Sequence, residues 1–142
     1  MKKSAIIVLL TLLISPMSLL ANNMVSESPS NAKVYFIHPK DGQTVQKSVK
    51  VVFGLKNIGV APAGTDKKNT GHHHLLIDTD VLPDLTKPLP ATDKLKHFGG
   101  GQTETEITLS PGKHTLQLLL GNYAHIPHSK PVISKKITIT VE

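Results

Sequence analysis

Three consecutive histidines, His72, His73 and His74, are the most chemically suggestive feature of this 142-residue chain. Imidazole nitrogen is a common ligand for zinc and copper. In a β-strand, side chains two residues apart point to the same face, with α-carbons roughly 6.5 Å apart. His72 and His74 can therefore turn their rings toward one ion, while His73 points the other way.

A pair of strand histidines supplies only half of a coordination sphere, so further ligands must come from other segments. His97 follows a long segment without a strand pattern, and His125 and His128 flank Ile126-Pro127. In a sandwich the connecting loops gather at the ends, where such residues can meet. We therefore predict one metal site, with Asp78 or Asp80 as additional oxygen ligands. Its predicted imidazole ligands are His72, His74, His97, His125 and His128.

The ligand types narrow the choice of metal. The chain has no cysteine, and Met24 is the only methionine after residue 21, so a soft Cu(I) site is disfavoured. Imidazoles suit Cu(II), Zn(II) or Ni(II), and the order of affinities favours copper where copper is present. Because protonated imidazole cannot ligate, we expect binding to weaken as the pH falls through about 6.5.

A structural role is the competing interpretation for each histidine. Leu75 and Ile77 suggest that His73 shares their buried face, whereas Leu76 argues that His72 and His74 do. Inward-pointing histidines could simply bond to backbone groups. For His114, beside a turn, and for His38, at the end of a strand, the structural interpretation is favoured.

Alternating apolar and polar residues predict strands throughout, and no segment has helical periodicity. Val49, Val51 and Phe53 alternate with polar or small residues, as do Ile137, Ile139 and Val141 with lysine and threonine. The connection from 79 to 101 contains three prolines and ends in Gly99-Gly100-Gly101, which we interpret as a bend where the backbone passes close to another group. The predicted strands are 33–38, 48–57, 71–78, 102–109, 113–121 and 132–141, with a seventh short strand at 43–46 or near Val60.

These strands predict an all-β fold, an immunoglobulin-like antiparallel β-sandwich of six to seven strands with one long loop. A small barrel is the alternative. The domain is expected over residues 33–142, after a flexible N-terminal segment at 22–32.

The first residues have the layout of a secretory signal peptide. Lys2 and Lys3 precede an apolar run that is too short for a typical membrane span, Pro16 breaks the run, and Ala21 offers a cleavage site. We expect residues 1–21 to be removed, and the mature protein to be periplasmic or secreted without a transmembrane segment.

Composition argues against several classes of function. All basic residues are lysine, which weakens a nucleic-acid role because base and phosphate contacts favour arginine. The aromatic content of 4% leaves few stacking surfaces. No nucleophile elbow, P-loop or dinucleotide fingerprint is present, so no enzyme is predicted.

Four blocks of sequence resemble one known family. The chain is similar to the domain of unknown function 4399 (DUF4399) family of bacterial exported proteins from about Val34 to Val141. The resemblance implies an exported domain without an assigned activity, and its shared blocks coincide with the histidines above. The blocks are Gly71–Asp78, His97–Glu104, Pro111–Leu118 and His125–His128, with a matching turn at Pro39–Gly42.

The leading hypothesis from the sequence is an exported, histidine-rich protein that binds Cu(II) or Zn(II) for metal buffering, delivery or tolerance. The alternative is a non-catalytic adhesion or interaction module with an envelope protein as its partner, in which the histidines are structural. A third idea, a copper- or zinc-dependent enzyme, would require an open coordination position and a substrate pocket.

Overall fold

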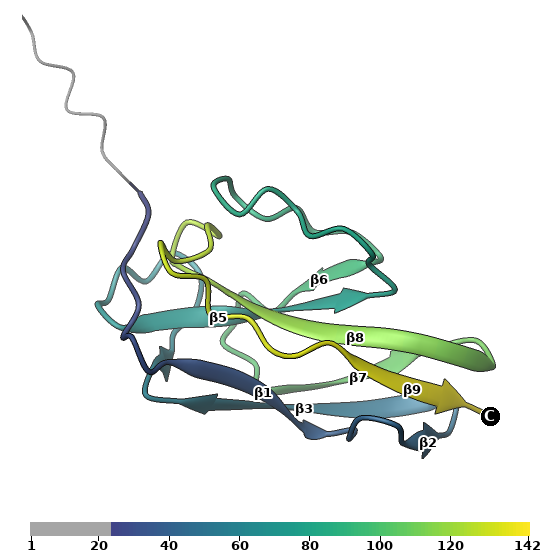
Figure 1. Cartoon of the computed structure of the whole chain (residues 1–142). Coiled ribbons are helices and arrows are strands. Elements are labelled where there is room, and N and C mark those ends of the chain that lie inside the picture. The colour runs from purple at the N-terminus through teal and green to yellow at the C-terminus, as the bar shows by residue number, and fades with distance from the viewer. Residues whose placement is uncertain (1–23) are drawn as a thin grey trace, which may run out of the picture.

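A computed structural model describes residues 24–142 of the protein as two β-sheets packed face to face (Figure 1). The predicted signal peptide and the first two residues of the predicted N-terminal segment lie outside the described residues. In residues 24–142 no helix is long and apolar enough to cross a membrane. The strands are β1 (Lys33–His38), β2 (Thr44–Val45), β3 (Ser48–Lys56), β4 (Gly59–Val60), β5 (Thr70–Ile77), β6 (Leu95–His97), β7 (Glu104–Thr108), β8 (Gly112–Gly121) and β9 (Ile137–Val141).

The two sheets confirm the predicted all-β sandwich. One has the order β1-β3-β7, and the other has the order β2-β9-β8-β5-β4, with β6 also paired to β5. Most neighbours are antiparallel, but β2 pairs with β9 and β4 pairs with β5 in parallel, so the six-stranded sheet is mixed. These parallel pairs are only two residues long. The sequence predicted one short strand, at 43–46 or near Val60, and the structure has a strand at each place, so that with β6 the described residues form nine strands where six to seven were predicted.

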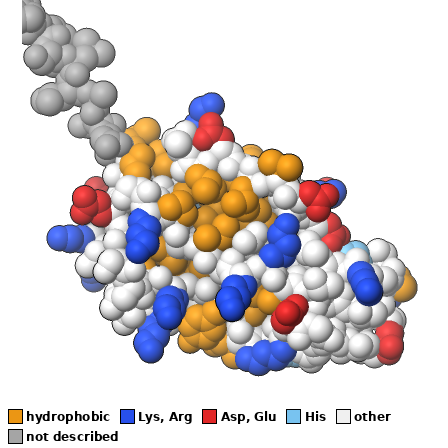
Figure 2. Space-filling model, in the orientation of Figure 1, with side chains coloured by type: hydrophobic (Ala, Val, Ile, Leu, Met, Phe, Trp, Pro, Cys, Tyr) orange, Lys and Arg blue, Asp and Glu red, His pale blue; other side chains and the backbone are white. Residues whose placement is uncertain are grey.

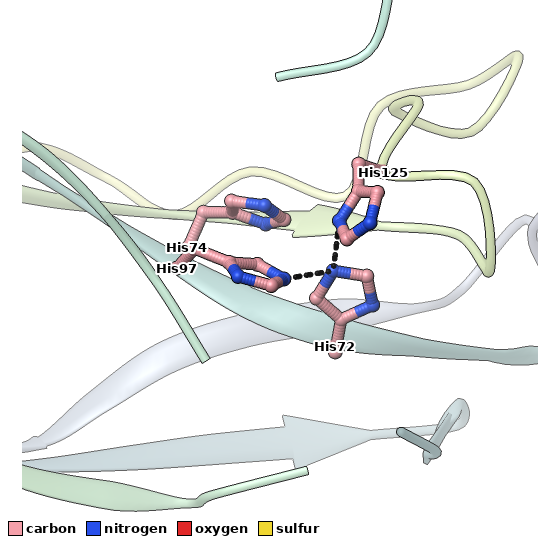
Figure 3. Close-up of side chains that lie close together, drawn as sticks. All are labelled: His72, His74, His97 and His125. Atoms are coloured by element: carbon pink, nitrogen blue, oxygen red, sulfur yellow. Dashed lines mark hydrogen bonds between the residues drawn. The ribbon is translucent and has the colours of Figure 1, made fainter. Parts of the chain in front are cut away.

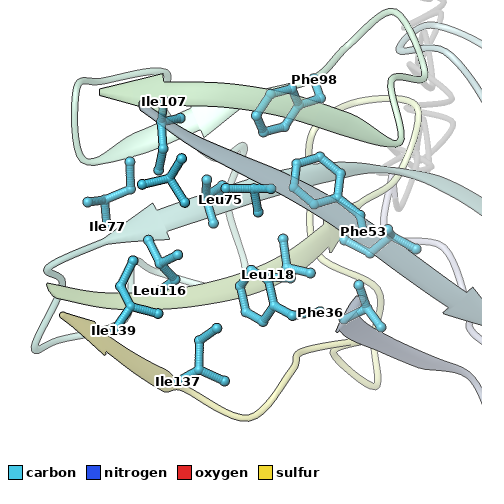
Figure 4. Close-up of a cluster of buried hydrophobic side chains, with 14 of the residues drawn as sticks. Phe36, Phe53, Leu75, Ile77, Phe98, Ile107, Leu116, Leu118, Ile137 and Ile139 are labelled. Atoms are coloured by element: carbon cyan, nitrogen blue, oxygen red, sulfur yellow. The ribbon is translucent and has the colours of Figure 1, made fainter. Parts of the chain in front are cut away.

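The main core fills the space between the sheets (Figure 4). Its members come from alternate positions of each strand, because successive strand side chains point to opposite faces. Val49, Val51 and Phe53 of β3 oppose Leu116, Leu118 and Leu120 of β8, as the sequence pattern predicted. Ile137, Ile139 and Val141 of β9 extend the same core.

Strand β5 is buried on both faces, which settles the ambiguity in its sequence pattern. His73, Leu75 and Ile77 belong to the face that packs on the main core, where the His73 ring lies 4.8 Å from the Phe53 ring, centre to centre. His72, His74 and Leu76 point to the opposite face and are also buried. This outer face is covered by the long connection between β5 and β7.

The long connection packs through its own apolar residues. Leu89 and Leu95 form a second hydrophobic cluster with Leu76 and Leu119 on the outer face of the sheet. Leu95 begins β6, so the connection is not free of strands as the sequence suggested. The periodicity was missed because three residues are too few to show alternation.

His114 fastens the start of this connection, and it confirms the structural role expected for that residue. Its Nδ1 donates to Asp78 Oδ2 at 2.7 Å and its Nε2 donates to the Ser110 carbonyl at 2.8 Å. Burial by itself lowers the pKa of His114, but the hydrogen bonds to Asp78 and Ser110 and the charge of Asp78 outweigh it and raise the pKa above 6.5. The folded protein therefore favours the imidazolium form of His114.

We predict that His114 contributes to the free energy of unfolding at low pH and that this contribution is lost at high pH. A pKa raised by folding stabilises the protein fully below the unfolded value of about 6.5, and the contribution disappears as the pH rises through the folded value. In denaturant titrations, His114→Gln should cost about 1 kcal/mol at pH 6 and less at pH 9, because the pair is partly exposed. Wild-type and variant curves that stay parallel from pH 6 to 9 would contradict this role.

Candidate metal centre

Four imidazoles from three separate segments meet on the outer face of the six-stranded sheet (Figure 3). His72 and His74 come from β5, His97 from the end of β6, and His125 from the turn after β8. One ring nitrogen of each lies within 4.8 Å of the chosen nitrogen of every other. Residues that are up to 53 positions apart in the sequence thus lie close enough together to contact a single ion.

The sheet itself places three of these side chains. His72 and His74 share a face because they are two residues apart on one strand. Strand β6 pairs antiparallel with β5 so that His97 lies directly opposite His74. Cross-strand neighbours have β-carbons about 5 Å apart, which brings the rings of His74 and His97 side by side; their centroids are 5.1 Å apart.

A tight turn supplies the fourth side chain. His125 adopts a left-handed backbone conformation with φ of 64°. The buried side chain of Asn122 shapes this turn, since its Oδ1 accepts hydrogen bonds from the backbone N–H groups of Ala124 and Ile126. Asn122 is a positioning residue that sequence analysis missed, although its place in Gly121-Asn122 after a strand is a recognisable turn signal.

Two glycines make room for the rings. A β-carbon at Gly121, which lies opposite His72 on β8, would come within 2.8 Å of His74 Cε1. A β-carbon at Gly99 would lie 2.3 Å from Cε1 of His97. The close backbone approach predicted for the glycine run therefore occurs at Gly99, and the neighbour is one of the four imidazoles.

The distances between ring nitrogens match a coordination sphere. His72 Nε2 lies 3.2 Å from His125 Nδ1 and 3.2 Å from His97 Nε2 (Figure 3). Bonds of 2.0–2.1 Å to a tetrahedral ion place neighbouring ligand atoms ~3.3 Å apart. His72 is thus already spaced from both His97 and His125 as two ligands of one ion are spaced.

The ring nitrogens of His74 lack hydrogen-bond partners in the part of the chain that the structure describes. Both of its ring nitrogens are buried, and within residues 24–142 neither has a hydrogen-bond partner. A buried polar group without a partner costs about 1–3 kcal/mol. An ion at the centre of the four rings would supply a partner for one of these two nitrogens.

The rings are held in the form that binds metal. Burial, followed by the neighbouring imidazoles, lowers the pKa of His72 to about 4 and that of His74 to about 3. Burial and the charge of His125 also lower the pKa of His97. Protons therefore compete for the buried pair at a lower pH than the value of about 6.5 expected from the sequence.

The other predicted ligands lie elsewhere. His128 is buried, but its Nε2 donates to the Thr70 carbonyl at 3.1 Å, and it is not a member of the group of four. Asp78 is bound to His114 and to the backbone N–H of Thr115, and Asp80 is not in the group either. The cluster in the described part of the chain consists of imidazoles alone.

Comparisons with known proteins give a family and two distant similarities. The family model described as "Domain of unknown function (DUF4399)" matches residues 51–142. WD repeat-containing protein 72 of Pongo abelii is 32% identical over 105 residues, which is 70% of this chain but 10% of that protein. The endo-beta-1,4-mannanase from Thermotoga petrophila aligns over 82% of this chain and 21% of its own, with 21% identity and a TM-score of 0.46. The chain thus spans about a tenth of the first protein and a fifth of the second.

We predict that the metal-free protein loses stability steeply in mild acid. A histidine whose pKa is lowered by folding binds fewer protons than the unfolded chain between its two pKa values, so stability falls as the pH drops below about 6.5. This pH range ends at the pKa of each histidine in the folded protein, which is about 4 for His72, about 4 for His73 and about 3 for His74. Each pKa unit corresponds to about 1.4 kcal/mol, so the combined loss at pH 5 should exceed about 3 kcal/mol.

Thermal unfolding of chelator-treated protein between pH 7.5 and 4.5 measures this loss. The His74→Leu variant removes one buried titrating group and should show a shallower dependence on pH. A melting temperature that stays constant over this range would contradict burial of the three rings in neutral form.

Proposed function

This chain belongs to the DUF4399 family, and from the site that its fold assembles we propose that it is an exported protein that binds Cu(II) or Zn(II) through His72, His74, His97 and His125. One observation carries the proposal, namely the convergence of four imidazole nitrogens within 4.8 Å of one another. Both ring nitrogens of His74 lack a hydrogen-bond partner among the described residues, so one of them is free to face an ion. Both ring nitrogens of His73 lack a partner there as well, although this ring faces the main core, so the convergence and not the missing partner carries the proposal.

The all-imidazole ligand set supports the choice of metal. Imidazole is a borderline ligand that suits Cu(II) and Zn(II), while Ca²⁺ and Mg²⁺ require oxygen ligands. The chain contains no cysteine that could select Cu(I). Burial lowers the pKa of His72 to about 4 and that of His74 to about 3, so these two rings are neutral at neutral pH and can take up a cation without losing a proton first.

The number and burial of the ligands support binding and exchange of the ion over catalysis. Four protein ligands fill a tetrahedral sphere, whereas catalytic zinc sites keep one position open. His72 and His74 form a buried floor, and His97 and His125 are partly exposed. An ion could thus enter and leave from the side of His97 and His125, which suits metal buffering, delivery or tolerance.

We predict that the protein binds about one equivalent of Cu(II) or Zn(II). Elemental analysis of protein expressed from the full-length gene and purified without an affinity tag measures the bound metal. His72→Ala/His74→Ala should weaken binding by at least about 100-fold, because loss of even an outer-shell partner costs 10–100-fold.

His128→Gln is the matched control, since His128 is equally buried but lies outside the group of four. This variant should retain its metal. Equal metal content in the wild type, the double variant and the control would refute ligation by these histidines, and the histidines would then be structural.

Export is supported by the sequence of residues 1–21, which lie outside the described residues. We predict cleavage after Ala21 or within a few residues of it. The intact mass of protein purified from the periplasm or the culture medium measures the cleavage site. An uncleaved chain recovered in the membrane fraction would contradict export as a free protein.

A further inference from the structure

A groove of about 520 Å³ opens at one edge of the sandwich, away from the histidines. One wall is β1 and the other is the segment 131–137 that leads into β9. Apolar side chains form its floor, and four of them also belong to the main core. These four are Val34, Phe36, Val132 and Ile137.

One wall is the edge of a strand, and the other is an extended segment that joins the neighbouring sheet through an isolated bridge at Ile133. Strand β1 is the outermost strand of its sheet. On the other wall, the Val132 carbonyl and the Ser134 N–H bond to β8, so that the opposite edge of this segment faces the groove. Hydrogen bonds join the neighbouring segments at the two ends of the groove, where the Gly42 N–H donates to the Thr138 carbonyl and Lys130 Nζ donates to the Ser30 carbonyl.

Lysines give the rim of the groove a positive charge. Lys33, Lys40 and Lys135 line it, against the single carboxylate of Asp41. Oδ1 of Asp41 already accepts the Thr138 N–H. Within residues 24–142, none of the three lysines has a carboxylate within 4.0 Å. Figure 2 shows lysines spaced around hydrophobic side chains on this face of the molecule.

The walls are unsuited to an added β-strand. The pairing of β1 shifts register between Phe36 and His38, and prolines stand at Pro39 and Pro131. Bulges, prolines and edge lysines are the devices by which sheet edges avoid pairing with other strands. A second copy of this chain is disfavoured as well, because its rim would bring lysines against lysines.

We propose that this groove binds the alkyl chain of a free long-chain fatty acid, with the carboxylate held at the lysine rim. The volume lies within the range of small-ligand pockets, which are largely apolar with a few polar groups that fix orientation. The alkyl chain would lie over Val34, Phe36, Val132 and Ile137, whose small remaining exposed surface forms the floor of the groove. The carboxylate would pair with Lys33 of one wall or Lys135 of the other.

The site is independent of the metal proposal, because none of the four clustered histidines lines the groove. Isothermal titration of chelator-treated, delipidated protein with dodecanoate, below its micellar concentration, tests binding without metal coordination. Dodecylamine is the matched probe with the same chain and the opposite charge. We expect saturable binding of dodecanoate at one site, and at least about tenfold weaker binding of dodecylamine.

Two variants test the location of the site. Lys33→Glu/Lys135→Glu should weaken dodecanoate binding by about tenfold or more, whereas Lys67→Glu/Lys113→Glu, a matched charge reversal outside the groove, should not. Ala32→Trp should block the groove without removing a lysine. Absence of saturable binding, equal affinity for the two probes, or equal weakening by both charge reversals would overturn the proposal.

Discussion

Burial of β5 on both faces is the constraint on which the rest of the structure depends. One face packs on the main core through His73, Leu75 and Ile77, and the other is covered by the long connection. Three consecutive histidines are therefore removed from water together. Their pKa values fall because desolvation penalises the charged form, and this leaves neutral rings with lone pairs. A histidine pair on an exposed strand would remain partly protonated at neutral pH and free to rotate.

The connection between β5 and β7 has a double role that explains its length. It covers the outer face with Leu89 and Leu95, and it carries His97 to a position opposite His74. The Leu89 N–H also bonds to the His125 carbonyl, which joins the connection to the turn that bears the fourth imidazole. The cover and the site are thus one unit, fastened at its start by the Asp78–His114 pair.

The two proposed binding sites use different surfaces of the sandwich. The imidazole cluster lies on the outer face of the six-stranded sheet, where the covering segment brings ligands from outside the sheet. The groove lies beside β1, at the edge of the sandwich. The register shift of β1 and the proline that follows it disfavour pairing with another strand, so no strand within residues 24–142 covers the apolar residues on the floor of the groove. The chain has no cysteine, so packing and hydrogen bonds stabilise both sites without a disulfide.

The sequence by itself predicted the all-β class, and it predicted the bounds of most long strands to within two residues, although the last strand begins at Ile137 and not at 132. It also predicted that His72, His74, His97 and His125 come together, but it wrongly added His128 to them. Alternation fixed which residues of β3, β8 and β9 enter the core, because a strand with one wet face shows a period of two. For β5 the strand itself was predicted, but its buried face stayed open, because a strand that is buried on both faces has no alternation. Strand β6 was missed because three residues are too few to show alternation.

Only the tertiary structure decided which histidines meet. Spacing along a strand is enough to place His72 beside His74. The register of β6 against β5 brings His97 next to them. The turn at Asn122–Ile126, in which His125 has a left-handed backbone conformation, brings His125 into the cluster, whereas His128 binds the Thr70 carbonyl instead. Register and turn conformation follow from long-range pairing and from side-chain packing between distant segments. A local pattern of residue types does not encode those contacts, so the sequence alone could not specify which histidines form the cluster.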